Sequence, residues 1–426
     1  MIYESSTIRV EDCTIDGDRT NVVVTFPFAR GKDGFRDPFG KEFFARRAIS
    51  AIHITISTSN WFQSEELNAA LSAVRTRTAQ FDRVVTYGQS MGGYGAIAAS
   101  AAVGAHAILA MAPQFSLDRA KVPWEKRWPV QHTAIVDGGG YVRDELEELI
   151  APEAELYLVY DPRTVDSRHV DLIIPISRNA IPIPIPFAGH KIAQFLLDAK
   201  LLSELVESIV RGMPFDGKAW RKRFRAVRSG LGHWWMEVSD GARRRTALTV
   251  LAARRALAIE PQGRRQQVVM AKALISNNQY EEAVIFLSDV VATFPKDGPL
   301  RMMLGYALLR AGRPEKALQE FETVALLMPA SGDVITMMER ARDVIAKKDQ
   351  PIGKDVMYDA MAAKATPSID AGRFENIPTA SDVVLGPLLP GSSKFGESCN
   401  SQAPHREQER RSWRYGGASV IRIKRG

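Results

Sequence analysis

Short apolar runs alternate with helix-like segments over the first part of the chain. The runs are rich in β-branched residues and lack strict alternation of apolar and polar positions, which is typical of strands buried on both faces of a sheet. They lie at residues 21–26, 51–57, 83–87, 106–111 and 155–160. Amphipathic or small-residue stretches separate them. This order predicts an α/β fold in which a mostly parallel, doubly wound sheet is covered by helices on both sides.

Residues 180–187 (AIPIPIPF) place a proline at every second position. Because every second N–H group of a strand points to the same side, the missing donors would lie along one edge. The run therefore predicts an edge strand whose outer side cannot recruit another chain, with a polyproline II segment as the alternative. The amphipathic run 191–210 that follows predicts one long helix that closes the domain.

From about residue 228 to 347 the chain has only helical patterns, and these repeat with a period of 34 residues. Residues 281–295 align with residues 315–329 at this offset. Both blocks carry a small residue (Ala283 and Ala317), a large apolar residue four positions later, and a final proline. The period and the pattern resemble the tetratricopeptide repeat (TPR), whose paired helices stack into a solenoid.

The resemblance covers two full repeats at 262–329 and a degenerate one at about 228–261, where Thr249 replaces the small alanine. A capping helix is expected at 331–347. The resemblance implies that this part of the chain binds a protein partner. The first helices of the repeats are rich in methionine, a side chain that adapts to varied shapes. We therefore expect a groove for a peptide or helix, the alternative being that these methionines pack only against neighbouring repeats.

The patterns divide the 426 residues into four parts. Residues 1–210 form the α/β domain, 211–227 a basic linker bounded by glycines, and 228–348 the all-α repeats. Residues 349–426 are rich in proline, glycine, serine and charge with little periodicity, and we expect this tail to be mostly disordered. Two or three domains suit a chain of this length.

Composition narrows the class of protein. The chain is 45% hydrophobic and 25% charged, as soluble globular proteins are, and no run approaches the ~18 apolar residues of a membrane span. The N-terminus lacks the apolar core of a signal peptide. The two cysteines, Cys13 and Cys399, lie at opposite ends of the chain, which argues against a disulfide framework or a zinc knuckle. We expect a cytoplasmic protein.

The net charge of +7 is concentrated in basic clusters at residues 221–228, at 243–245 and in the last 25 residues. Such clusters attract nucleic acid or anionic lipid in some proteins. No nucleic-acid-binding module accompanies them in this sequence. We interpret them as solvated helix faces and a polar tail, and expect no nucleic-acid partner.

One motif carries chemistry: Gly88-Gln89-Ser90-Met91-Gly92 follows a predicted buried strand and precedes a run of small residues. In a sharp strand-to-helix turn the central serine is strained, and side chains two residues to either side would clash. Glycine at 88 and 92 fits this requirement. The turn exposes the serine hydroxyl and points the first N–H groups of the next helix at a reacting carbonyl oxygen. Ser90 is therefore the predicted nucleophile.

Over residues 20–210 the strand order and this nucleophile elbow resemble the α/β-hydrolase superfamily. The resemblance implies a Ser–acid–His triad in that chain order and an ester or thioester hydrolase or acyltransferase. It places the acid after a later strand, so Asp161 is the first choice, Asp166 the second and Asp137 the third. Asp166 is otherwise interpreted as the N-cap of a short helix. His190, between the proline run and the closing helix, is the expected base.

In this triad His190 takes the proton of Ser90 and later protonates the leaving group, while Asp161 orients the imidazole. The class of enzyme implied is a serine hydrolase that acts on a small or carrier-bound acyl substrate. It needs neither a metal nor a cofactor.

Two loops at the rim of the predicted sheet complete the expected site. The oxyanion hole needs the N–H group of Met91 and a second donor, expected from Phe28 or Ala29, because the HGGG sequence of lipases is absent. Asn60-Trp61-Phe62 lies at the same rim and either lines the substrate pocket or caps a helix. The insertion at 113–154 is either a lid or a cover packed on the top of the sheet.

Two functional classes remain after these observations. The first is a serine hydrolase or acyltransferase with repeats that recruit a protein. The second is a TPR interaction protein whose hydrolase-like domain is an inactive scaffold. The complete Ser–Asp–His order favours the first, because an inactive relic has no need to keep all three residues.

Overall fold

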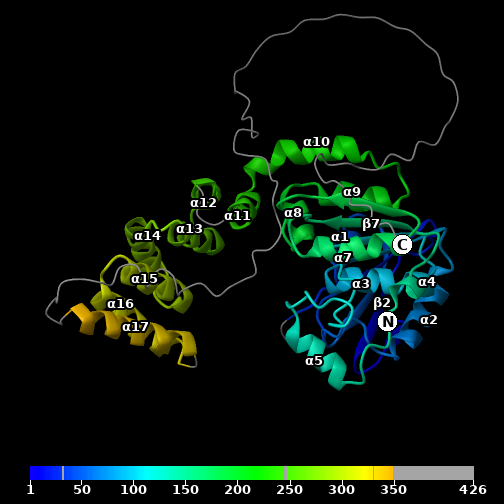
Figure 1. Ribbon diagram of the computed structural model, residues 1–426. Helices are drawn as coiled ribbons and strands as arrows, with labels where there is room; N and C mark the ends of the chain where they lie inside the picture. The colour runs from blue at the N-terminus through cyan, green and yellow to red at the C-terminus, as the bar shows by residue number, and fades with distance from the viewer. Residues whose placement is uncertain (31–32, 243–246, 330, 349–426) are drawn as a thin grey trace, which may run out of the picture. The chain divides into compact units, whose positions relative to one another are not determined.

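The computed structural model describes residues 1–30, 33–242, 247–329 and 331–348 (Figure 1). A mixed sheet with helices on both faces comes first along the chain, and a run of paired helices follows. The tail predicted at 349–426 and the basic cluster at 243–245 lie outside the described residues.

Eight strands form the sheet of the described chain, in the order β1-β2-β4-β3-β5-β6-β7-β8. Their bounds are Tyr3–Glu4 (β1), Ile8–Cys13 (β2), Asn21–Phe26 (β3), Ser50–Ile56 (β4), Arg83–Gln89 (β5), Ala107–Met111 (β6), Glu155–Tyr160 (β7) and Ala180–Pro184 (β8). The strands β3 to β8 are parallel, as predicted, whereas β2 pairs antiparallel with β4 and with β1. The sequence interpretation missed β1 and β2, although buried Ile8 and Val10 flank a partly exposed residue in the period-two pattern of a strand.

Helices cover both faces of the sheet, because successive side chains of a strand point to opposite faces. In β3, Val22 and Val24 belong to one apolar core and Val23 to the other. The first core includes side chains from α2 (Leu67–Thr78), α3 (Met91–Ala98), α4 (Ser100–Val103), α5 (Pro129–Asp137), α6 (Leu146–Leu149) and α7 (Asp166–Ile173). The second includes side chains from α1 (Lys41–Ala45), α8 (Ile192–Asp198), α9 (Leu202–Val210) and α10 (Gly217–Val227).

The proline run forms the edge strand β8, as predicted. It pairs with β7 alone, in parallel. The N–H group of Ile185, just beyond the strand, donates to the carbonyl of Tyr160 at 2.8 Å. The prolines Pro182 and Pro184 alternate with the residues whose N–H groups face β7, so the missing donors lie on the outer side.

The prediction of one long helix over 191–210 is wrong, because the chain breaks between α8 and α9. Lys200 adopts the left-handed backbone conformation with φ 57°. The N–H group of Leu201 then donates back to the carbonyl of Leu196 at 2.9 Å, the bond that closes a helix C-terminus. The break turns the chain so that Leu196 and Leu205 both reach the second core.

The segment predicted as a basic linker contains α10, whose apolar face is buried. Trp220 and Phe224 are almost fully buried in the second core, and their ring planes are nearly parallel at a centroid distance of 6.4 Å. The cationic residues occupy the rest of the helix surface, as predicted for a solvated face. By its contacts, α10 packs against α8 and the loop after it: the ring of Phe224 lies edge-on to that of Phe195, and Trp220 donates to the carbonyl of Leu201.

The helical region follows the predicted repeat. Its helices are α11 (Gly232–Gly241), α12 (Ala247–Ile259), α13 (Arg264–Ser276), α14 (Tyr280–Thr293), α15 (Gly298–Arg310), α16 (Pro314–Leu327) and α17 (Gly332–Lys348). The helices α13, α15 and α17 begin 34 residues apart. Ala283 and Ala317 are fully buried, and a Cβ atom at Gly305 would overlap the ring of buried Phe321. The small residues thus allow close packing where the helices cross.

Candidate active site

Ser90 stands at a sharp turn between β5 and α3. Its backbone has φ 57° and ψ −123°, a conformation that non-glycine residues avoid. The Ser90 N–H group donates to the carbonyl of Met111 at 2.8 Å, so the neighbouring strand β6 holds the turn in place. The strain is thus maintained by the sheet, as the strand-to-helix elbow predicted from the sequence requires.

The two glycines of the elbow have no room for a side chain. A Cβ atom at Gly88 would overlap the backbone of Gly92, and one at Gly92 would overlap the carbonyl of Phe26. The backbone on both sides of Ser90 is therefore packed more closely than any larger residue allows. This confirms the reason given for glycine at both positions.

Three of the residues considered for the triad, Ser90, His190 and Asp166, meet at this turn. The Ser90 hydroxyl lies 2.9 Å from Nε2 of His190, and Nδ1 of His190 lies 2.8 Å from Oδ2 of Asp166. Because a carboxylate only accepts, Nδ1 carries the proton and Nε2 is left to accept from the hydroxyl. Ser90 and Asp166 are buried, whereas 28% of the His190 side chain remains accessible.

The first choice of acid, Asp161, is wrong as the partner of His190; the second choice, Asp166, occupies that place. Asp161 accepts from the backbone N–H groups of Gly189 at 2.8 Å and Arg163 at 3.0 Å. Its carboxylate is therefore used by the loop before His190 and not by the imidazole. The third choice, Asp137, is the exposed last residue of α5.

Asp166 does not cap α7, contrary to its interpretation as a helix N-cap. It is the first residue within the helix, Val165 is the N-cap, and no side chain caps the helix. The carboxylate instead points at His190 and Arg127. Only four residues of turn separate the two aspartates, and no motif distinguishes them; the loop at 187–190 presents His190 to Asp166.

The insertion at 113–154 supplies charged residues that the sequence interpretation missed. Arg127 donates from Nη1 to Oδ1 of Asp166 at 2.7 Å, and its other nitrogens contact Glu125 at 2.6–3.1 Å. Glu125 in turn accepts from Nε2 of buried His169 at 2.9 Å. Since Nδ1 of His169 accepts from a backbone N–H group, its Nε2 must carry the proton. The segment WEKRW was the only sequence signal for this network.

Burial and neighbouring charges set the pKa of each carboxyl group at this site. Burial by itself raises the pKa of Asp166, but the hydrogen bond with His190 and the charge of Arg127 outweigh it, so the pKa lies below its ordinary value. Burial likewise opposes ionisation of Glu125, yet His169 and Arg127 lower its pKa to about 2. Burial raises the pKa of Asp161, in spite of its backbone hydrogen bonds. Asp166 is thus the better anion of the two candidates.

Aromatic side chains and an amide form a wall beside the serine. Trp61 is buried, has a positive φ of 52°, and donates from Nε1 to Oε1 of Gln114 at 3.2 Å. The same oxygen lies 3.4 Å from Oγ of Ser90, whose single proton points to His190. Trp128 bridges Trp61 and His190, with ring centroids 5.1 and 6.4 Å away. The Trp61 segment therefore lines the site, and Gln114 is a neighbour of Ser90 that no motif had indicated.

The N–H groups expected to stabilise an oxyanion lie at the elbow and at the end of β3. Met91 is the first residue of α3, where N–H groups have no partner within the helix. Within the described residues, the N–H groups of Phe28, Ala29 and Met91 donate to no protein acceptor. The turn of α3 packs against the carbonyls of Phe26 and Pro27. The loop that carries Phe28 and Ala29 is therefore adjacent to Met91.

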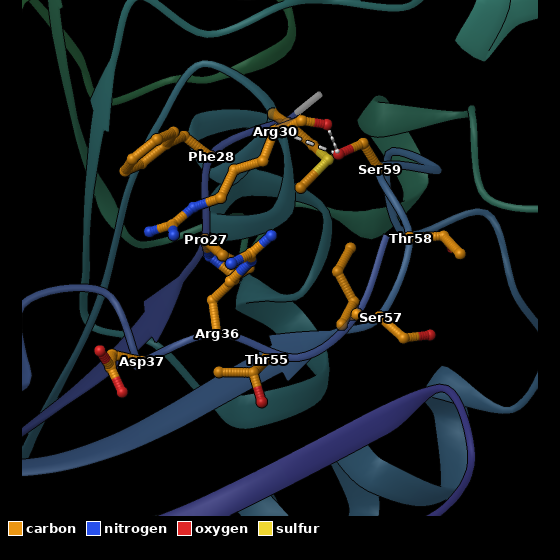
Figure 2. A pocket seen from close by; sticks show the side chains of 12 residues that line it. Pro27, Phe28, Arg30, Arg36, Asp37, Thr55, Ser57, Thr58 and Ser59 are labelled. Atoms are coloured by element: carbon orange, nitrogen blue, oxygen red, sulfur yellow. Dashed lines mark hydrogen bonds between the residues drawn. The ribbon is translucent and has the colours of Figure 1, made fainter. Parts of the chain in front are cut away.

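A small pocket, open to solvent, lies next to these residues (Figure 2). Its wall combines the loop after β3, the loop after β4 and the side chain of Met91. Two arginines, Arg30 and Arg36, line it together with the hydroxyls of Ser57, Thr58 and Ser59. The Ser59 hydroxyl joins the two loops, because it lies 2.9 Å from the Arg30 N–H group and 3.1 Å from the Arg30 carbonyl.

Other histidines of the sheet domain have structural surroundings. His53 is buried in β4, contacts the Thr25 hydroxyl at 2.7 Å, and burial lowers its pKa to about 4. Nδ1 of His106 accepts from the N–H group of Val84. The described residues contain no group of three or more His, Cys, Asp or Glu side chains suited to a metal ion, and in the same ranges no helix is long and apolar enough to cross a membrane.

One family comparison concerns the helical region. Residues 274–340 match the family described as Tetratricopeptide repeat. The helices α14 to α16 and the first half of α17 fall within this match, so this segment consists of TPR repeats, as its 34-residue period predicted. No curated protein matches the sequence of the chain.

Three solved structures illustrate how distant the structural likenesses are. The second TPR domain of human RPAP3, in complex with an HSP70 peptide, is 22% identical over 22% of this chain and 78% of its own, with a TM-score of 0.21. MamA AMB-1 is 20% identical over 35% and 81%, with a TM-score of 0.25. The capsule O-acetyltransferase of Neisseria meningitidis serogroup A is 12% identical over 47% and 93%, with a TM-score of 0.35. None of them assigns an activity to this chain.

Proposed function

We propose that the sheet domain is an α/β-hydrolase that cleaves or transfers an acyl group from an ester or thioester through an acyl-serine intermediate. The observation that carries the proposal is the hydrogen-bonded line from the Ser90 hydroxyl through His190 to Asp166, at 2.9 and 2.8 Å. A serine on a strained elbow, a base within hydrogen-bond reach and an acid that orients the base are the parts of an activated nucleophile.

The steps follow from these contacts. Nε2 of His190 takes the Ser90 proton as Oγ attacks the carbonyl carbon, and the tetrahedral oxyanion accepts from the Met91 N–H group and from that of Phe28 or Ala29. Collapse expels the alcohol or thiol, which takes the proton back from His190. Water or a second alcohol, activated by the same imidazole, then attacks the acyl-serine and restores the hydroxyl.

Asp166 and Arg127 have separate parts in this scheme. The anionic Asp166 holds the proton on Nδ1 and stabilises the imidazolium that forms during attack. Arg127 keeps Asp166 ionised and, through Glu125, ties it to buried His169. Arg127 and protonated His190 repel each other, because both carry a positive charge. Arg127 therefore supports the imidazolium only because the Asp166 carboxylate lies between the two cations.

The repeats are proposed to hold a protein partner or a carrier of the acyl group. The match of residues 274–340 to the TPR family supports this second role, since stacked TPR helices form extended binding surfaces. If the sheet domain had no activity, partner binding would be the remaining function of the chain.

Labelling with a fluorophosphonate probe tests the proposed nucleophile. The wild-type chain is expected to form a covalent adduct on Ser90, because an activated serine oxygen displaces fluoride from the probe and forms a phosphonate ester. Ser90→Ala is expected to abolish the adduct, and Ser72→Ala, which alters an exposed serine on α2, to leave it unchanged. Mass spectrometry of the labelled peptide identifies the site. An unlabelled wild-type chain would reject the proposal.

A further inference from the structure

We propose that the pocket beside Met91 binds an anionic group of the substrate, a carboxylate or a phosphate. This inference rests on the proposed function, since it names the class of substrate that the same site takes. The pocket is small and open to solvent. Met91 and Phe28 belong both to its wall and to the expected oxyanion hole. A group bound in the pocket would therefore be part of the same substrate molecule as the reacting ester.

The charge of the pocket carries the argument. Arg30 and Arg36 are exposed and form no ion pair within the described residues. Guanidinium groups bind carboxylate and phosphate through paired N–H donors. Two cations without an anion at one pocket therefore indicate that the ligand supplies the negative charge.

The remaining lining fits the same ligand. Figure 2 shows Arg36 extending into the centre of the view, Arg30 above it, and Asp37 apart from both. The Arg30 guanidinium lies over the ring of Phe28 at 4.8 Å, which limits its freedom. Ser57 and Thr58 add polar residues to the lining. Since two cations face one carboxylate among the lining residues, the pocket keeps a net positive charge.

Matched esters test this inference. One pair, mono-4-nitrophenyl adipate and 4-nitrophenyl hexanoate, differs in charge on the acyl side; the other, 4-acetoxybenzoate and its methyl ester, differs on the alcohol side. In the wild-type chain we expect kcat/KM to favour the anionic ester at least tenfold in one of the pairs. The double variant R30Q/R36Q is expected to lose this preference to within about twofold while it keeps its rate on the neutral esters. R46Q, which removes the exposed arginine at the C-cap of α1, is the control.

The outcomes separate the two proposals. Equal rates on the charged and neutral esters, or a preference that survives in R30Q/R36Q, would overturn the anionic subsite and leave the hydrolase intact. Absence of turnover on every ester, together with absence of fluorophosphonate labelling, would overturn the proposed function itself.

A different set of contacts points independently to α11 as the element that positions His190. The loop before the histidine has two left-handed residues, Phe187 with φ 64° and Gly189 with φ 67°. The carbonyl of Ala188 between them accepts from Nε2 of His233 at 3.1 Å. His233 is 8% exposed and belongs to α11, the first helix of the helical region, which also continues into the core of the repeats.

Neighbouring residues complete this clamp. Trp234 packs edge-on against Phe187, with ring centroids 5.9 Å apart. A Cβ atom at Gly189 would come within 2.7 Å of the Glu237 carboxylate. From the other side, Asp161 accepts from the Gly189 N–H group. The position of His190 relative to Ser90 therefore depends on Asp161 and α11 together, and His233 acts as a positioning residue through the loop backbone.

Three variants of the full chain test this role. H233A removes the donor to the Ala188 carbonyl, and we expect kcat on 4-nitrophenyl acetate to fall about tenfold with KM changed less than twofold. H233Q keeps an N–H donor and is expected to recover kcat to within about threefold of wild type. W235F, which alters an α11 side chain bonded to Ser229, is the control.

The comparison of H233Q with H233A distinguishes a role of His233 in positioning His190 from a role in folding. The kinetics are to be measured at a temperature where circular dichroism shows all variants folded. A wild-type kcat in H233A, or equally low kcat in H233Q and H233A at equal thermal stability, would overturn the inference. Loss of turnover in Ser90→Ala would still stand in either case.

Discussion

Asp166→Asn is expected to lower kcat on 4-nitrophenyl acetate by on the order of 10³- to 10⁴-fold. The amide offers an N–H group where His190 Nδ1 needs an acceptor, so the imidazole is driven toward the tautomer that cannot take the Ser90 proton. Arg127 adds to the loss: its Nη1 lies 3.5 Å from Nδ1 of His190, and without the carboxylate this cation opposes the imidazolium.

Asp161→Asn is the matched control for this variant. Asparagine still accepts from the Gly189 N–H group, so we expect a loss of about tenfold or less. Burial raises the pKa of Asp161 above its ordinary value. Folding therefore disfavours its ionisation relative to the unfolded chain, so the neutral amide is expected not to lower stability at pH 7. A larger kinetic loss in Asp161→Asn than in Asp166→Asn would return the acid to Asp161.

The difference in unfolding free energy between wild type and Asp166→Asn is expected to depend on pH. The pKa of Asp166 is lowered by folding, so its carboxylate contributes stability above the unfolded-state pKa of about 3.9, and this contribution is lost as pH falls through the folded-state pKa. Urea unfolding at pH 7 should therefore show Asp166→Asn below wild type. The difference between the two should narrow as the pH is lowered past 4.

Ser90→Ala and His190→Ala are each expected to lower turnover of 4-nitrophenyl acetate by on the order of 10³-fold or more. The two side chains act as one unit, because the hydroxyl is a weak nucleophile until Nε2 of His190 takes its proton. The double variant should therefore be no slower than either single variant. Steady-state rates of all three, beside the Ser72→Ala control, measure this.

Two results would contradict the paired nucleophile and base. Multiplicative losses in the double variant would mean that Ser90 and His190 act independently. Turnover in Ser90→Ala equal to wild type would mean that the proposed acyl-serine intermediate does not form.

Several features of this protein follow from its sequence alone, because each depends on neighbours in the chain. The elbow requires glycine at 88 and 92, where any side chain would overlap nearby backbone. The prolines at 182 and 184 exclude a central strand, and β8 is indeed at the edge. The 34-residue period of the helices needed only a comparison of the chain with itself, and α13, α15 and α17 keep it.

Only the tertiary structure decided which residues meet at the site, because these contacts join segments far apart in the chain. Asp161 and Asp166 were both plausible partners of His190. The choice depends on how the loop at 187–189, held by α11 and by Asp161 itself, presents the imidazole. Arg127 comes from an insertion without a motif, and its hydrogen bond to Asp166 spans 39 residues. Local patterns determine strands, turns and repeats, whereas the pairing of buried charges is set by the packing of the whole fold.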